Sequence, residues 1–478
     1  MISEVLLIGH WLIVVGLSLR VIVRRLPVGV SVAWLAVIFS VPVVGAVLYL
    51  LFGEKRLGRR RAARIAANLD EVQTWQAGFR RTDESAAASI NPWAEPLDRL
   101  AGQVLGFPAQ AGNELRLLDS SDRFFDALVA DIDTATERCH LAFYIWFEGG
   151  RTADVVDALI RAAERGVECR ALGDALGSQD FLRSDLLARL RRGGVGFSSA
   201  LPTSLLSFLS SRADLRNHRK IVVIDDRVAY TGSQNLVDPR FFKQDSGVGE
   251  WVDAMVRVTG PAARALGGVF ALDWSVETGS RFVPPERTAA AAPGTGGSVV
   301  QVVPSGPDLR PEAIHQLLLT AIYGARRELV MTTPYFVPDE SILTALLSAA
   351  LRGVAVTLVV PAHNDSRLVR YASVAHFDDL MSAGVRIALF GGGLLHTKSL
   401  TVDGEVSIFG SVNLDMRSLW LNFEISLFVY DPGFTNRLRE LQAGYLDRST
   451  TLDLATWRER PRWHQLAEDA VRLLSPLL

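Results

Sequence analysis

The sequence predicts an α/β protein in which one domain occurs twice, preceded by an apolar segment that associates with a membrane. Three observations support this prediction. A strand–helix–strand pattern appears twice, each copy contains the same short histidine motif, and two long apolar stretches open the chain of 478 residues. A chain of this length exceeds one ordinary domain, so several parts are expected.

The repeated pattern is the main sign of a duplication. It is formed by residues 141–146, 154–163 and 167–172 in the first copy and by residues 329–333, 341–351 and 354–360 in the second. The sequence Arg-Gly-Val joins each predicted helix to the next strand, and the glycine suits a helix C-cap. A stretch rich in Pro, Ala and Gly, from Pro284 to Gly297, lies between the copies and predicts a linker. The copies are too long for a solenoid repeat, so we expect a covalent pseudo-dimer.

These observations divide the chain into five parts. We expect an N-terminal membrane hairpin with a basic flank over residues 1–65, a connector over 66–95, a first α/β domain over 96–282, a linker over 283–298 and a second α/β domain over 299–478.

The two apolar stretches cover about residues 5–23 and 28–52. Each is long enough to cross a bilayer as a helix. Basic residues after the second stretch, from Lys55 to Arg64, favour a transmembrane hairpin with both ends in the cytoplasm. The arginines of the short connection count against that orientation. His10 and Arg20 interrupt the first stretch, and an interfacial position of that stretch is the alternative.

Charge is distributed unevenly along the chain. The first 65 residues contain nine Lys or Arg and two Glu, and the remainder contains 41 basic and 50 acidic residues, a net charge of −9. Nucleic-acid binding depends on many Lys or Arg contacts with phosphates, so this acidic remainder disfavours a nucleic-acid partner. The two cysteines, Cys139 and Cys169, lie in apolar runs and are expected to be buried free thiols in a reducing cytoplasm.

One motif occurs once in each copy with identical spacing. It begins with His218 and Lys220 in the first copy and with His396 and Lys398 in the second. An aspartate follows five residues after each lysine, and a Gly-Ser-x-Asn sequence follows further on. These residues are Asp225, Ser233 and Asn235 in the first copy, and Asp403, Ser411 and Asn413 in the second. The chain contains only four lysines, and two of them stand in these motifs. The His, Lys and Asp residues are therefore the catalytic candidates.

The residue types of the motif suit phosphoryl transfer. The β-branched residues after each lysine predict a strand, on which His and Lys two positions apart point the same way. A turn after each aspartate brings the serine and asparagine of the next strand back beside them. Each copy then supplies an imidazole, a compact ammonium charge for one phosphate oxygen, and a hydroxyl and an amide that bind the phosphate. Two copies that face each other complete the site. The same strand parity turns both aspartates away, which favours a structural role for them.

Both copies match the motif H-x-K-x4-D-x6-G-[GS]-x-N at every position, and the chain resembles the phospholipase D superfamily over about residues 110–450. Within that superfamily it resembles the bacterial cardiolipin synthases. The paired N-terminal apolar segments carry this second resemblance, together with Phe52-Gly53, Trp251-Val252-Asp253, Asp273-Trp274 and Asn422-Phe423-Glu424. The resemblance implies two phospholipase D-like domains that form a pseudo-dimer with the active site at their seam.

The resemblance also implies a metal-independent transfer in two steps. His218, the favoured nucleophile, attacks the phosphorus of phosphatidylglycerol, and His396 protonates the departing glycerol. A hydroxyl of a second phosphatidylglycerol then resolves the phosphohistidine and gives cardiolipin. Asp253 and Glu424 are implied as the carboxylates that orient the two imidazoles. Phosphatidylglycerol, other anionic phospholipids and the membrane are the implied partners. A multi-pass location in the bacterial plasma membrane, with cytoplasmic catalytic domains, is implied as well.

Other functions stay open at this point. Water as the acceptor makes the protein a phospholipase D, and another alcohol makes it a different transphosphatidylase. A nuclease is disfavoured by the membrane hairpin and the acidic remainder. A non-catalytic lipid-binding scaffold is disfavoured because a binder does not need two imidazoles. Neither motif histidine has a second His, Cys or acidic residue at ligand spacing, so no metal and no cofactor are expected. No oligomeric state follows from the sequence.

Overall fold

The computed structural model describes residues 2–24, 28–54, 57–80, 90–202, 212, 214–285, 297–308 and 310–472. The chain divides into two compact units. One, the N-terminal unit, comprises residues 1–63 and 202–215, and the other, the body, comprises residues 64–201 and 216–478. Most of the predicted linker over 283–298 lies outside the described residues.

The N-terminal unit contains helices α1 (Ile2–Val23), α2 (Val28–Ser40) and α3 (Pro42–Leu48), and a π-helical turn over Tyr49–Gly53. Residues 28–52 are predicted as one apolar segment, but the structure breaks it at Val41. The reason is Pro42, which lacks a backbone N–H and begins a new helix. The rings of Trp34 and Tyr49 lie 5.5 Å apart, although a continuous helix would separate these residues by about 22 Å. The segment therefore folds back on itself.

Polar contacts join the ends of this unit. The Glu54 carboxylate accepts hydrogen bonds from Arg20 Nε at 2.5 Å and from Tyr49 Oη at 3.0 Å. Many apolar side chains of the three helices face outward, among them Leu12 and Val23, which are 69% and 77% exposed. Within the described residues, no helix combines the length and the hydropathy needed to cross a membrane.

Helix α4 (Arg59–Arg80) occupies much of the segment predicted as a connector. Its Trp75 packs edge-on against Phe107 and Phe282 of the body, at ring-centroid distances of 5.7 Å and 6.1 Å. Arg64 Nη1 donates to Val276 O at 2.7 Å. The connector is therefore a packed helix as far as Arg80, and α6 (Glu95–Leu105) follows before the first strand.

One sheet of 15 strands forms the centre of the body. The first half contributes β1 (Gln110–Leu118), β2 (Arg138–Phe143), β3 (Glu168–Asp174), β4 (Gly196–Ala200), β5 (Ile221–Ile224), β6 (Val228–Gly232) and β8 (Met255–Thr259). The second half contributes β9 (Ser298–Ser305), β10 (Glu328–Thr332), β12 (Ala355–Pro361), β13 (Arg386–Phe390), β15 (Lys398–Val402), β16 (Val406–Gly410), β18 (Glu424–Val429) and β19 (Ser449–Thr451).

The strand order reveals the duplication. It runs β19-β13-β12-β10-β15-β16-β18-β9-β1-β8-β6-β5-β2-β3-β4. Strands β9 and β1 pair antiparallel in the middle, and equivalent strands follow in the same succession on either side. The sheet therefore has a pseudo-twofold arrangement, with β19 as an addition at one edge. The body thus consists of two like α/β domains, as the repeated pattern predicts.

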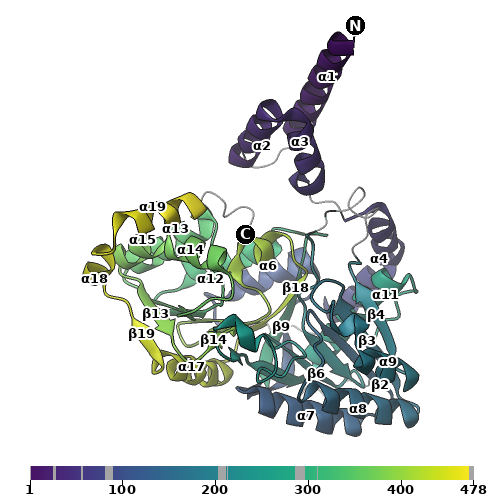
Figure 1. The fold of residues 1–478 in the computed structure, drawn as a ribbon. Helices are drawn as coiled ribbons and strands as arrows, with labels where there is room; N and C mark the ends of the chain where they lie inside the picture. The colour runs from purple at the N-terminus through teal and green to yellow at the C-terminus, as the bar shows by residue number, and fades with distance from the viewer. Residues whose placement is uncertain are drawn as a thin grey trace. The chain divides into compact units, whose positions relative to one another are not determined.

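Helices cover both faces of the sheet (Figure 1). The helices of the body after the first strand are α7 (Ser121–Asp133), α8 (Thr152–Glu164), α9 (Asp185–Arg192), α11 (Pro261–Thr278), α12 (Ala313–Gly324), α13 (Glu340–Leu351), α14 (Arg367–Val374), α15 (Phe377–Ser382), α16 (Met416–Trp420), α17 (Pro432–Leu446), α18 (Leu454–Arg458) and α19 (Arg462–Arg472). Of these, α19 packs against α14, and α18 against α15. One buried cluster joins Leu266 of α11 and Phe434 of α17 to Val256 of β8 and Leu427 of β18. This cluster spans both halves, so apolar packing holds the seam together.

Two short strand pairs lie outside the main sheet. β11 (Phe336–Val337) pairs in parallel with β17 (Leu414–Asp415), and β7 (Trp251–Val252) pairs in parallel with β14 (Leu394–Leu395). The second pair joins the first half of the body to the second.

Candidate active site at the seam of the two halves

A short parallel pairing positions His396. Leu395 of β14 is the register partner of Val252 of β7, so the next residues, His396 and Asp253, stand side by side. The His396 backbone N–H donates to Val252 O at 2.8 Å. The imidazole Nδ1 lies 2.7 Å from Asp253 Oδ1, and the two residues are 2% and 3% exposed. The carboxylate comes from the first half of the body and the histidine from the second.

An equivalent parallel pairing positions His218, with the contributions of the two halves exchanged. Asn217 forms a parallel bridge with Phe423, and the His218 backbone N–H donates to Phe423 O at 2.8 Å. His218 Nδ1 lies 2.9 Å from Oε2 of Glu424, the residue after Phe423. Here the histidine comes from the first half and the carboxylate from the second. Each imidazole therefore depends on a carboxylate of the other half.

The carboxylates determine which nitrogen of each imidazole can react. An ionised carboxylate only accepts hydrogen bonds, so Nδ1 carries the hydrogen and Nε2 keeps a free electron pair. Burial lowers the pKa of His218 and of His396 to about 4, with a further lowering by nearby lysines, although the carboxylates act in the opposite direction. Burial raises the pKa of Asp253 and Glu424, but the facing histidine and lysine outweigh it and hold both below their usual values.

The motif lysines are buried beside the histidines. Lys220 Nζ donates to His218 O at 2.7 Å, and Lys398 Nζ donates to His396 O at 2.6 Å. Burial lowers the pKa of Lys220 to about 8 and that of Lys398 well below its usual value. The charge of Lys398 acts on His218 and that of Lys220 acts on His396. The two motifs therefore form one site.

The start of each motif differs from the prediction. Strand β5 begins at Ile221 and β15 at Lys398, so both histidines precede the strands in which they are predicted. The parallel pairing with the other half, which the sequence pattern does not reveal, holds them there. The predicted hairpins are present, and Lys398 is the register partner of Gly410, so the following Ser411 and Asn413 return to the site.

The motif serines have a different position from the one predicted. Ser233 Oγ donates to Asp253 Oδ1, and Ser411 Oγ donates to Glu424 Oε2, each at 2.5 Å. Both serines are fully buried. A hydroxyl has one hydrogen to donate, and here it stabilises a carboxylate rather than a phosphate. The serines therefore lie behind the imidazole–carboxylate pairs.

The motif asparagines offer amide atoms to the site. Asn235 Oδ1 accepts from the Ile145 backbone N–H at 3.1 Å, while its buried Nδ2 has no partner among the described residues. The buried Oδ1 of Asn413 likewise has no partner among them. An unpaired buried amide is unfavourable, so a bound phosphate would satisfy the Asn235 donor.

The motif aspartates are not at the reacting centre, although both belong to the catalytic candidates of the sequence. Asp225 accepts hydrogen bonds from the backbone N–H groups of Thr136, Glu137 and Arg138 at 2.8–2.9 Å. Asp403 accepts those of Arg326, Arg327 and Glu328 at 2.7–3.0 Å. Each aspartate thus fixes the loop that enters the neighbouring strand, in agreement with the direction expected from strand parity.

Comparison with known families decides the assignment of the chain. The model of the phospholipase D-like domain of cardiolipin synthase matches residues 128–249 and 318–443, and that of the phospholipase D-nuclease N-terminal segment matches residues 11–54. The first match covers both motifs and more than half of the chain. The chain belongs to the cardiolipin synthase family of the phospholipase D superfamily.

Relatives agree over the whole length. Cardiolipin synthase A of Yersinia pestis is 47% identical over 479 residues, which cover 100% of this chain and 99% of the relative. Cardiolipin synthase A of Yersinia pseudotuberculosis has the same identity and coverage. The solved structure of phosphatidylserine synthase from Haemophilus influenzae shares the fold, with a TM-score of 0.60 and 16% identity. That match covers 81% of this chain and 100% of the other.

The residue between the histidine and the lysine differs between the two motifs of this member of the cardiolipin synthase family: it is Arg219 in the first and Thr397 in the second. No role was predicted for either residue from the sequence. Arg219 Nη1 lies 2.6 Å from Asp273 Oδ1, and Arg219 Nε donates to Glu424 O at 3.0 Å. At the equivalent position, Thr397 Oγ1 instead lies 3.0 Å from Tyr445 Oη. The buried arginine could have been suspected, because a charge between His and Lys must find a partner.

The aromatic surroundings of the histidines also differ. The ring of Tyr144 lies 4.9 Å from that of His218, and the ring of Trp251 lies 4.3 Å from that of His396. No group of three His, Cys, Asp or Glu side chains in the described ranges is arranged to hold a metal ion.

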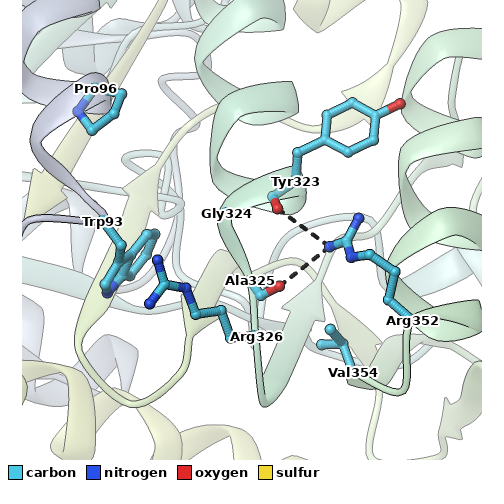
Figure 2. A pocket seen from close by; sticks show the side chains of 8 residues that line it. All are labelled: Trp93, Pro96, Tyr323, Gly324, Ala325, Arg326, Arg352 and Val354. Carbon is cyan, nitrogen blue, oxygen red and sulfur yellow. Dashed lines mark hydrogen bonds between the residues drawn. The ribbon is translucent and has the colours of Figure 1, made fainter.

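A cavity of about 530 Å³ lies elsewhere in the body, lined by Trp93, Pro96, Tyr323, Gly324, Ala325, Arg326, Arg352 and Val354 (Figure 2). Its Arg352 guanidinium donates to Tyr323 O at 3.3 Å and to Ala325 O at 3.2 Å. Arg165 makes similar contacts with Ile132 O and Ala135 O in the first half. Arg352 and Arg165 therefore have equivalent roles in the two halves, because each donates to backbone carbonyls at the C-terminal end of a helix. No motif residue lines the cavity.

Proposed function

We propose that the chain transfers a phosphatidyl group from one phosphatidylglycerol to another through a phosphohistidine, releasing glycerol and forming cardiolipin. Membership of the cardiolipin synthase family supports the reaction class. The observation that carries the proposal is the reciprocal exchange of carboxylates, in which His218 contacts Glu424 and His396 contacts Asp253. Two imidazoles with fixed tautomers are what a covalent step and a proton transfer each require.

In the first step the Nε2 electron pair of His218 attacks the phosphorus. A phosphorus–nitrogen bond forms and the bond from phosphorus to the glycerol oxygen breaks. The bound anionic phosphate opposes the lowering of the His396 pKa by burial, so that His396 is protonated at Nε2 for this step. It gives this proton to the departing oxygen, and glycerol leaves as the neutral alcohol. Lys220, Lys398 and the amide of Asn235 stabilise the charge on the phosphate oxygens.

In the second step the roles of the groups reverse. A hydroxyl of the second phosphatidylglycerol gives its proton to Nε2 of His396 and its oxygen attacks the phosphorus. The phosphorus–nitrogen bond breaks and its electron pair returns to His218. The enzyme regains its starting protonation state, and the product carries two phosphodiesters.

The assignment of His218 as nucleophile rests on the family resemblance, because the two imidazole–carboxylate pairs are geometrically alike. Asp253 and Glu424 are positioning residues that act through the imidazoles. Ser233 and Ser411 do not contact the imidazoles in this proposal; they hold the two carboxylates in place. We place Asp225 and Asp403 outside the chemistry.

The N-terminal part is proposed to hold the enzyme at the bacterial plasma membrane. We retain a helical hairpin over residues 1–65 with a basic flank, a connector over 66–95, two phospholipase D-like domains over 96–282 and 299–478 joined by 283–298, and cytoplasmic catalytic domains. The family match over residues 11–54 and the outward-facing apolar side chains of the N-terminal unit support membrane association. Phosphatidylglycerol and other anionic phospholipids are the proposed partners.

Product analysis tests the proposed reaction. The purified full-length protein is incubated with phosphatidylglycerol in detergent micelles, and lipids are identified by mass spectrometry. Cardiolipin and glycerol in equal amounts are expected. Phosphatidic acid as the main product would identify a phospholipase D instead. A protein that binds the lipid without turnover would be a scaffold. The His218→Ala variant is the inactive control.

A further inference from the structure

Lys243 is the one lysine of the body outside the two motifs, and its position is unusual. Its backbone has φ +49° and ψ +38°, a left-handed conformation that residues other than glycine rarely adopt. Such strain persists where surrounding contacts hold it, often at functional sites. The Lys243 side chain is 46% exposed, in contrast to the buried lysines of the motifs.

Ring contacts connect Lys243 to the proposed acid–base histidine. Its Nζ lies 5.4 Å from the ring centroid of Trp251, and the Trp251 ring lies 4.3 Å from the His396 ring. Trp251 is 5% exposed and His396 is 2% exposed. The ammonium is therefore at the solvent-facing end of a series of ring contacts whose buried end is the imidazole.

The same ammonium joins the two halves of the body. Lys243 Nζ lies 3.1 Å from Oδ2 of Asp365, and the other oxygen of Asp365 accepts from Tyr335 Oη at 3.0 Å. Lys243 belongs to the first half, and Asp365 and Tyr335 to the second. The Lys243 side chain is 46% exposed and that of Asp365 is 11% exposed, so water reaches the ammonium and another anion that enters there can compete with the carboxylate for it. Tyr335 remains as a partner for Asp365 when the lysine leaves.

The proposed reaction needs such a cation. Two anionic lipids must meet at one site, and the chain after residue 65 has a net charge of −9 that repels both. The motif lysines serve the phosphate of the donor lipid. The acceptor lipid carries a phosphodiester of its own, three carbons away from the hydroxyl that His396 must deprotonate.

We propose that Lys243 releases Asp365 and binds the phosphodiester of the acceptor phospholipid, so that its free hydroxyl reaches His396. The inference rests on the proposed function and extends it to a second phosphate site. It makes Lys243 a residue that favours a phosphate-bearing acceptor over a phosphate-free alcohol. Asp365 pairs with the Lys243 ammonium only when that acceptor is absent.

Competition between two acceptors tests this site. The full-length enzyme is supplied with phosphatidylglycerol micelles and isotope-labelled glycerol. Labelled glycerol returning to the phosphatidyl-enzyme gives labelled phosphatidylglycerol and reports an acceptor without phosphate. Cardiolipin reports an acceptor with phosphate. The ratio of cardiolipin to labelled phosphatidylglycerol is measured for the wild type, Lys243→Gln, Lys243→Arg and Asp365→Asn.

The variants separate phosphate binding from a structural latch, because Lys243→Gln and Asp365→Asn break the same ion pair. We expect the ratio to fall by about fivefold or more in Lys243→Gln, in line with the loss of one charged contact. Lys243→Arg and Asp365→Asn should keep the wild-type ratio or exceed it. An unchanged ratio in Lys243→Gln, or an equal fall in Asp365→Asn, would overturn the proposal. A wild type that forms only phosphatidic acid would instead overturn the proposed function, so the two failures are distinct.

Discussion

His218 Nδ1 lies 2.9 Å from Oε2 of Glu424, a residue 206 positions further along the chain and in the other half of the sheet. His396 reaches back in the same way to Asp253, 143 positions earlier. Neither half therefore contains both a motif histidine and the carboxylate that orients it. The duplication has produced a site whose parts are exchanged between the copies, so each half needs the other for chemistry as well as for packing.

Replacing the carboxylate by an amide tests this exchange. In Glu424→Gln the side chain keeps its size, but its NH₂ can donate to Nδ1 and turn the imidazole to the unreactive tautomer. We expect the kcat for cardiolipin formation to fall about a hundredfold or more, with little change in the thermal unfolding midpoint. Glu440→Gln, on the exposed face of α17, is the control. Activity within about threefold of wild type would show that Glu424 does not orient His218.

The buried lysines should limit activity at high pH. Burial lowers the pKa of Lys220 to about 8, so its charge is present below that pH and is lost as the pH rises through it. The charged form is the one that binds phosphate. We therefore expect kcat/KM to decline above about pH 8, and to decline less steeply in Lys220→Arg, whose guanidinium stays charged. The measurement is kcat/KM in micelles from pH 6 to 10. A wild-type profile that stays flat up to pH 9.5 would contradict this assignment.

The motif aspartates should matter for stability more than for catalysis. Asp225→Ala removes the acceptor of three backbone N–H groups, and we expect a loss of about 2–4 kcal/mol of unfolding free energy. Asp403→Ala should behave alike. The kcat of the folded enzyme should stay within about threefold of wild type. Urea unfolding and activity at low temperature measure the two effects. A kcat that falls as far as in His218→Ala, with stability retained, would return the aspartates to the chemistry.

A histidine outside the site should make the protein sensitive to acid. His376 is 5% exposed, and neither ring nitrogen has a hydrogen-bond partner within the described ranges. Burial, with help from Arg472, lowers the pKa of His376 to about 4. In the unfolded chain His376 is therefore protonated below about pH 6.5, whereas in the folded protein it is protonated only below about pH 4. The folded protein loses stability as the pH falls through this range.

Removing this imidazole should remove that sensitivity. We expect His376→Leu to be close to wild type in stability at pH 7 and more stable by about 2 kcal/mol at pH 5. The unfolding midpoints of both proteins, compared between pH 7 and pH 5, measure the difference. If the unfolding midpoints of the two proteins change by the same amount between pH 7 and pH 5, His376 does not cause the loss of stability in acid.

Local patterns in the sequence predicted much of the fold. The repeated strand–helix–strand elements are present as β2, α8 and β3 and as β10, α13 and β12. Their boundaries differ by three residues at most, because apolar periodicity marks the buried face well. The helix over residues 59–80 was missed, since its apolar residues are spread among many polar ones. The break at Pro42 was missed because the apolar run on both sides is continuous.

The site was predictable in its residues and less so in its contacts. The motif spacing gave the histidines and lysines, and the family resemblance implied Asp253 and Glu424. The position of the serines behind the carboxylates was not inferred, because it depends on the antiparallel pairing of β6 with β8 and of β16 with β18, whose register the motif spacing does not determine. The same is true of the start of each motif, where His218 lies before its strand and is held by Phe423 of the other half.

Trapping the covalent intermediate tests the central claim most directly. The enzyme is mixed with phosphatidylglycerol, quenched within one turnover, and analysed by mass spectrometry of the intact protein and its peptides. A phosphatidyl group on His218 is expected in the wild type. It should be absent in His218→Ala. In His396→Ala it should form more slowly, because the departing glycerol receives no proton, and then accumulate, because no group activates the acceptor. An adduct on His396 that persists in His218→Ala would contradict the assigned roles, and no adduct in any form would contradict the covalent mechanism.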